Sequence, residues 1–256
     1  MTDDAITPNR ANRRGLWHAA GVTHRGKVRR VNEDAFILRP DIGLWGVADG
    51  MGGHRAGDVA SRMVVDALLA IENSATFAIR LDRIDDAMEA VNRELVEFGV
   101  DSSKGGLMGS TVALLTLDQS GLGAVMWAGD SRVYRWRHGR LEQLSTDHSQ
   151  VEEYVRDGMI SREEAAGHPE SNVVTRALGS HAEEVLEADV CDASAGDRFL
   201  LCSDGLTRHV TDAELEAHLA VDDTEAVCGQ LLQTTLDRGS VDNTTVVIVD
   251  IVGDPA

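Results

Sequence analysis

The sequence predicts one layered α+β domain, in which groups of short strands are interrupted by helices. Apolar, strand-like runs come in groups along the chain, and two amphipathic helices follow the first group directly. A Rossmann-like parallel sheet would instead need strict alternation of strands and helices. With 256 residues, 43% of them hydrophobic, the chain is long enough to bury one core of this kind.

The first part of the chain is predicted to hold three strands and then two helices. The strands are short apolar runs bounded by Gly, Pro, Asn or Asp, at residues 16–24, 34–39 and 43–48. A glycine-rich turn at 49–53 leads into the first helix, where apolar residues from Val59 to Ile71 fall on one stripe. A second stripe, from Ile84 to Leu95, predicts the next helix.

Composition and helix-capping patterns predict the remaining elements. β-Branched, aromatic and apolar residues indicate strands at 111–115, 124–127, 133–136, 198–203 and 244–249. His138-Gly139 fits a hairpin turn, and the polar segment 145–185 is expected to hold only short helices. The S/T-x-x-E capping box marks helix starts at Ser149, Ser161 and Thr211. A longer helix is expected over 223–237.

The charge and the cysteine content argue against several classes of protein. A formal net charge of −19, from 43 acidic and 24 basic residues, repels phosphate backbones and anionic lipid, so neither nucleic acid nor a membrane is an expected partner. Three cysteines without a CxxC pair disfavour a disulfide framework and a zinc site, and they suit a reducing cytoplasm. No apolar window could cross a bilayer, and residues 1–14 are expected to be a disordered leader without a secretory signal.

Acidic residues recur at or near the ends of the predicted strands. An acid excess alone is explained by solubility, and one Asp-Gly pair is mostly a turn signal. Here the same setting occurs at Glu33-Asp34, Asp49-Gly50, Gly129-Asp130, Asp204-Gly205 and Asp242-Asn243. A strand end holds a carboxylate rigidly, and hard divalent cations take several such oxygen ligands. The pattern therefore predicts a cation site built from separated aspartates.

Together these motifs resemble the bacterial PPM (type 2C) metal-dependent serine/threonine phosphatases. The resemblance runs from about 22 to 250 and is carried by Arg29-x-x-Asn32-Glu33-Asp34, Ala48-Asp49-Gly50-Met51-Gly52-Gly53-His54, Gly109-Ser110-Thr111, Gly129-Asp130-Ser131-Arg132, Ser203-Asp204-Gly205 and Asp242-Asn243-Thr244-Thr245. It implies one phosphatase domain over 15–254, a β-sandwich of two antiparallel sheets flanked by pairs of helices (four-layer αββα). The segment at about 145–185 resembles that family's small helical flap subdomain.

The resemblance also implies how two Mg²⁺ or Mn²⁺ ions are held. One ion would be bound by Asp49, Asp204 and Asp242, and the other by Asp49, the Gly50 carbonyl and the Glu33/Asp34 pair. Arg29 matches the arginine that binds the substrate phosphate, a role that suits the planar, two-pronged guanidinium. Two ions about 3.5–4 Å apart can ionise a bridging water. We therefore expect direct attack by that water on phosphoserine or phosphothreonine, without a phosphoenzyme.

Three residues near this set have open or unusual roles. His54 is a candidate general acid for the leaving alcohol, but a structural histidine at a helix start fits equally well. His148 is expected to pack or cap rather than to catalyse. Many family members bind a third, weaker metal through the residue equivalent to Asp130 and an acid four residues after Asp204, where this chain has Arg208. A third ion is accordingly expected to be weak, absent or replaced by the guanidinium.

Three classes of function are weighed against this pattern: a protein phosphatase, an inactive binding module, and a two-metal hydrolase of small phosphoesters or nucleic acid. An inactive module would lack a core ligand, and no core ligand is missing from the sequence. The negative charge disfavours a polynucleotide substrate. The resemblance implies phosphorylated protein substrates and a cognate serine/threonine kinase, and the whole-chain pattern is most similar to the branch tied to type VI secretion. We expect a cytoplasmic monomer.

Overall fold

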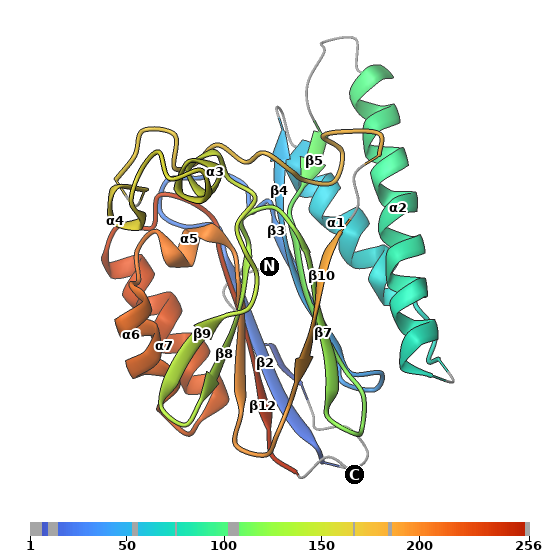
Figure 1. The fold of residues 1–256 in the computed structure, drawn as a ribbon, viewed down its shortest axis with the longest axis vertical. Helices are drawn as coiled ribbons and strands as arrows, with labels where there is room; N and C mark the ends of the chain where they lie inside the picture. Colours follow the sequence, from blue (N-terminus) through green and yellow to red (C-terminus); the bar gives the residue numbers. More distant parts are fainter. Residues whose placement is uncertain are drawn as a thin grey trace.

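Two antiparallel sheets pack face to face, and helices cover both outer faces (Figure 1). The computed structural model describes residues 7–9, 15–52, 56–74, 76–101, 108–165, 167–183 and 186–253. The arrangement is a four-layer αββα sandwich, which confirms the predicted α+β fold class.

The first sheet has the strand order β1-β2-β12-β11-β8-β9. Its strands are β1 (Thr7–Asn9), β2 (Trp17–His24), β12 (Thr244–Ile251), β11 (Arg198–Cys202), β8 (Arg132–Arg137) and β9 (Arg140–Gln143). The C-terminal strand β12 therefore lies between β2 and β11, paired along its whole length with β2. At the β8–β9 turn both His138 and Gly139 have positive φ, as the predicted hairpin requires.

The second sheet has the order β10-β7-β6-β4-β3, and β5 pairs with the far end of β4. Its strands are β10 (Glu187–Asp192), β7 (Leu122–Ala128), β6 (Val112–Leu117), β4 (Leu44–Gly52), β3 (Asp34–Arg39) and β5 (Met108–Ser110). Because β5 continues the pairing, the glycine-rich segment predicted to be a turn at 49–53 remains a strand through Gly52.

The helices are divided between the two outer faces. In Figure 1, α1 (Ala56–Leu69) and α2 (Phe77–Asp101) cover the second sheet, and α6 (Asp212–Leu219) and α7 (Thr224–Asp237) cover the first. Three short helices lie near one end of the sandwich: α3 (Gln150–Arg156), α4 (Arg162–Ala165) and α5 (Asp204–Thr207). The first two belong to the segment predicted to be a flap.

Alternate residues of the central strands belong to different layers of the core. In β11, Phe199 and Leu201 pack between the sheets, whereas Leu200 packs under α6 and α7. Trp17 and Trp45 meet edge to face between the sheets, with ring centroids 5.4 Å apart. Successive side chains point to opposite faces of a strand, and both faces are covered here. This explains why the central strands are continuous apolar runs instead of alternating patterns.

Some elements differ from the prediction. Thr7–Asn9, within the predicted disordered leader, form β1 on the edge of β2, so the prediction is wrong for these residues; residues 1–6 and 10–14 lie outside the described ranges. A strand with a free edge offers unpaired backbone groups, which explains the pairing. β10 also was not expected, because it is a mostly exposed edge strand of polar sequence.

The N-cap of α7 gives a test of this helix. The Asp223 carboxylate accepts a hydrogen bond from the Ala226 backbone N–H at 2.8 Å. Asp223→Ala should lower the free energy of unfolding by about 1 kcal/mol, measured by urea denaturation. Asp237→Ala, at the negative end of the same helix, is the matched control and should be neutral or slightly stabilising. Equal losses in both variants would contradict the capping role.

Candidate metal centre

The acidic residues singled out in the sequence converge at one end of the sandwich. A cavity of about 400 Å³ is lined there by five of them, together with two arginines: Glu33, Asp49, Asp130, Asp204, Asp242, Arg29 and Arg208. They come from both sheets, since Asp49 is on β4, Asp204 begins α5 and Asp242 precedes β12. Residues far apart in the sequence thus share one cavity.

Asp34 lies behind this cavity, at the junction of the two sheets. Its Oδ2 accepts hydrogen bonds from the hydroxyls of Ser203, at 2.8 Å, and Thr245, at 2.7 Å. Its Oδ1 is buried and has no hydrogen-bond partner among the residues that the structure describes, and the same holds for Oδ1 of Asp204. Unpartnered buried carboxylate oxygens are costly unless a cation or a donor faces them.

Gly50 allows three segments to meet behind the cavity. A Cβ at this position would lie 1.9 Å from the Gly57 carbonyl oxygen and 2.8 Å from that of Glu33. The Gly50 N–H donates to the Glu33 carbonyl at 3.0 Å. The end of β4 can therefore approach both α1 and the Glu33 backbone only if residue 50 has no side chain.

Asn243 holds the loop that carries Arg29 and Glu33. Its Oδ1 accepts from the Glu33 N–H at 2.8 Å, and its Nδ2 donates to the carbonyls of Arg25, at 2.9 Å, and Val31, at 3.0 Å. A single buried amide therefore fixes the position of the loop relative to Asp242, its neighbour in the sequence.

The two arginines pair with aspartates of the cavity. Arg29 Nη2 lies 2.8 Å from Asp242 Oδ2, and Arg208 pairs with Asp204 and, at 3.6 Å, with Asp242. Asp130 has no ion pair within the described part of the chain and is only 8% exposed. Five lining carboxylates against two guanidinium groups leave an excess of negative charge.

The pKa values of these carboxyl groups reflect that excess. Burial raises the pKa of Asp34 to about 7 and that of Asp130 to about 8, from 3.8 in each case. Burial first, and neighbouring carboxylates second, raise the pKa of Asp49 well above its ordinary value. Burial also raises the pKa of Asp204, although Arg208 opposes the shift. Each group is thus ionised at a free-energy cost that a nearby cation would lower.

The donors fit hard divalent ions in kind, being carboxylates and a backbone carbonyl. Across the described residues, no three acidic, histidine or cysteine side chains surround one point as ligands of an ion. Asp204 and Asp242 instead face Arg208 and Arg29. Arg208 and Arg29 occupy only Oδ2 of these two aspartates, and Oδ1 of Asp204 has no partner among the described residues, so it can face a cation directly.

The two histidines differ in what the structure shows. His54 lies outside the described residues. His148 is buried, its Nδ1 accepts from the Gly129 N–H at 3.1 Å, and its Nε2 lies 3.0 Å from Glu187 Oε2. Its ring stacks on Trp127 at 6.1 Å. These contacts make His148 a packing residue that supports the turn before Asp130.

Several positioning residues were not singled out from the sequence, namely Asn243, Ser203 and Thr245. All three stand within the quoted motifs, but a polar residue beside a strand end gives no sign of which partner it binds. Their buried position is the missing signal, because buried polar groups must find hydrogen-bond partners.

The known proteins whose sequences resemble this chain are protein phosphatases. A family profile described as "Protein phosphatase 2C" matches residues 20–239. The serine/threonine phosphatase stp of Listeria innocua is 36% identical over 241 residues, which cover 91% of this chain and 95% of the relative. The serine/threonine protein phosphatase PstP of Mycobacterium tuberculosis is 37% identical over 91% of this chain, which spans 45% of that longer protein.

Solved structures of related sequence have the same fold as this chain. PppA, described as a key regulatory component of T6SS in Pseudomonas aeruginosa, is 40% identical with a TM-score of 0.85, covering 92% of this chain and 97% of that one. The catalytic domain of PstP in complex with two manganese ions is 34% identical with a TM-score of 0.82, covering 93% and 99%.

The raised pKa values predict how the free energy of unfolding depends on pH when a chelator keeps the protein free of metal. The folded state keeps Asp34 and Asp130 protonated up to pH about 7 and 8, whereas the unfolded chain releases these protons near pH 4. Stability that these groups contribute at low pH is therefore lost as pH rises from about 4 to about 8. Urea denaturation with EDTA should show this fall, and Asp130→Asn should make it shallower. A free energy of unfolding that rises from pH 5 to 8 would contradict the assignment.

Proposed function

Since this chain belongs to the protein phosphatase 2C family of serine/threonine phosphatases, we propose that it hydrolyses phosphoserine and phosphothreonine on proteins, using two Mg²⁺ or Mn²⁺ ions. The observation that carries the proposal is the convergence of five carboxylates and two arginines on one cavity. The two manganese ions in the PstP catalytic domain support the choice of metal.

The proposed ligands follow the layout of the cavity. Asp49, Asp204 and Asp242 would hold one ion, and Asp49, the Gly50 carbonyl and Glu33 the other. Asp34 does not line the cavity, and Ser203 and Thr245 occupy its Oδ2; it therefore acts behind the ligands or through a water. Bound ions would supply an acidified water and neutralise charge on the phosphate.

Arg29 is the proposed binding group for the substrate phosphate. Its side chain is 49% exposed at the cavity wall and pairs with Asp242 on one side of the guanidinium. Guanidinium nitrogens can bind two phosphate oxygens at once, which would orient the ester. No serine or cysteine is among the described residues that line the cavity, which supports direct hydrolysis. His54 stays the proposed general acid, with a structural role as the alternative.

The biological setting is also a proposal. Phosphorylated proteins and a cognate serine/threonine kinase would be the partners of a cytoplasmic, monomeric enzyme. The likeness to PppA of Pseudomonas aeruginosa supports a role in type VI secretion. Among the residues that the structure covers, no helix has the length and apolar character needed to cross a membrane.

Loss of a ligand should abolish activity. Asp49→Asn and Asp204→Asn should each lower kcat/KM on a small aryl phosphate with Mn²⁺ by at least about 100-fold. Loss of a residue that only supports a metal ligand costs up to about 100-fold, and loss of a ligand itself should cost at least as much. Asp189→Asn, on the exposed strand β10, is the control and should leave activity unchanged. Faster hydrolysis of a nucleotide than of a phosphothreonine peptide would instead favour a small-molecule or nucleic-acid hydrolase.

The third metal site should be lost because of Arg208. Its guanidinium pairs with Asp204 next to Asp130, where a third cation would have to bind. Calorimetric titration with Mn²⁺ should therefore show two sites in the wild type, and Arg208→Asp should add a third, weaker one. A well-occupied third ion on Asp130 in the wild type would refute this prediction.

A further inference from the structure

A second cavity, of about 450 Å³, adjoins the metal centre, and the proposed chemistry does not use it. Four residues line both cavities: Asp130, Asn172, Asp204 and Arg208. The other walls come from β8 and β9, from the flap, and from the segment that joins α5 to α6. The residues on either side of a phosphorylated serine or threonine must pass next to the metal centre, and this cavity lies there.

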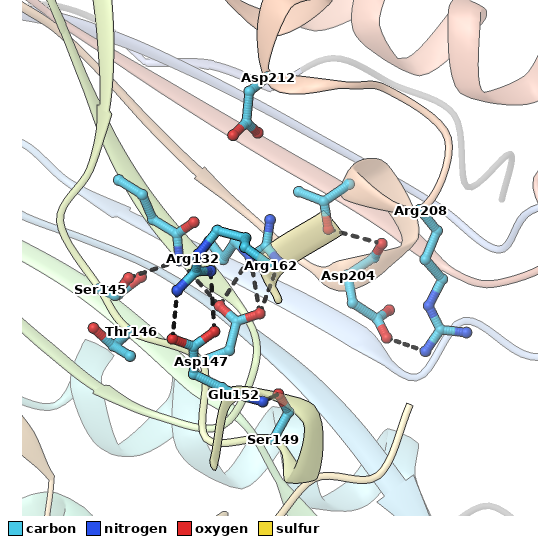
Figure 2. Close-up of polar contacts among 12 residues, drawn as sticks. Arg132, Ser145, Thr146, Asp147, Ser149, Glu152, Arg162, Asp204, Arg208 and Asp212 are labelled. Atoms are coloured by element: carbon cyan, nitrogen blue, oxygen red, sulfur yellow. Dashed lines mark hydrogen bonds and ion pairs between the residues drawn. The ribbon is translucent and has the colours of Figure 1, made fainter. Parts of the chain in front are cut away.

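The arginines in its walls are already paired with acids in the same walls. Arg132 binds Asp147 through Nε, at 2.8 and 3.0 Å, and through Nη2, at 2.7 Å. Arg162 binds Glu152 at 2.7 and 3.1 Å. Figure 2 shows these pairs beside the Arg208–Asp204 pair. The arginines of the walls are thus neutralised by neighbouring acids.

Two other acids of the walls have no ion-pair partner within the described ranges. Asp130 is more than nine-tenths buried, and its carboxylate has neither an ion pair nor a side-chain donor within the described ranges. Asp212 is exposed, and its Oδ1 accepts a long hydrogen bond, 3.4 Å, from the Tyr134 hydroxyl. In Figure 2 its carboxylate points toward the Arg132–Asp147 pair. Burial raises the pKa of Asp130 to about 8, so near neutral pH the unpaired negative charge of the walls is that of Asp212.

We propose that this cavity is a substrate subsite for the basic side chain of a residue flanking the phosphorylated serine or threonine. Its volume lies within the range of about 300–1,000 Å³ that ligand pockets span. Val151, Ala165 and Val210 offer apolar surface to the stem of a lysine or arginine. The exposed carboxylate of Asp212 attracts its charged end, and Asp130 offers a buried hydrogen-bond acceptor. The inference rests on the proposed phosphatase function and adds a sequence preference to it.

The test compares phosphothreonine peptides that carry Lys, Ala or Glu at each flanking position in turn. At one position the wild type should prefer Lys over Ala by about 3–10-fold in kcat/KM, mainly through KM, as expected for one ion pair with partial exposure. Asp212→Asn should reduce that ratio toward one, and Asp212→Glu should restore it. Asp189→Asn, on β10, should keep the wild-type ratio.

The ratio is taken within each variant, so an effect on the chemistry itself cancels. Wild-type hydrolysis of an aryl phosphate tests the phosphatase function separately. Equal rates for Lys and Ala peptides at all positions, a preference for Glu, or a ratio unchanged in Asp212→Asn would overturn the proposal. So would a preference that disappears as Mn²⁺ is raised, because the cavity would then be a metal site.

Discussion

The carboxylate of Asp34 joins the two sheets at the end of the sandwich that holds the proposed metal centre. Asp34 begins β3 in one sheet, and the hydroxyls that bind it stand at the end of β11 and on β12 in the other. A charge removed from water this completely persists only if donors or cations surround it. The neighbouring carboxylates are held in place by the close backbone approach at Gly50 and by the Asn243 amide, which binds the Glu33 backbone.

The acidic residues of this chain fall into two groups with different roles. Most of the excess of 43 acidic over 24 basic residues concerns the surface, where it favours solubility. The carboxylates of the proposed metal centre are different, because burial and mutual repulsion raise their pKa values. Arg29 and Arg208 provide part of the compensation from within the chain. The cavity therefore attracts cations strongly, while two of its arginines already occupy some of the carboxylate oxygens that a cation would bind.

The sequence predicted the central strands, the long helices and the converging acids, because each leaves a local signal. Apolar runs such as 244–249 and capping boxes such as Ser161–Glu164 depend on neighbours in the chain. Edge strands do not: β1 and β10 are defined by the partner they pair with. The role of Asn243 and the second cavity also depend on contacts between segments far apart in the sequence, which no local pattern contains.

The position of β12 has a consequence for how the enzyme is made. This strand lies between β2 and β11, and Asp242 comes just before it. During translation, β2, β4 and β11 leave the ribosome before β12 does, so a nascent chain has Asp49 and Asp204 but a gap in the middle of one sheet. Domains fold as units once their elements are available. Phosphatase activity would therefore appear only after β12 has emerged, and unfinished copies could not dephosphorylate anything near the ribosome.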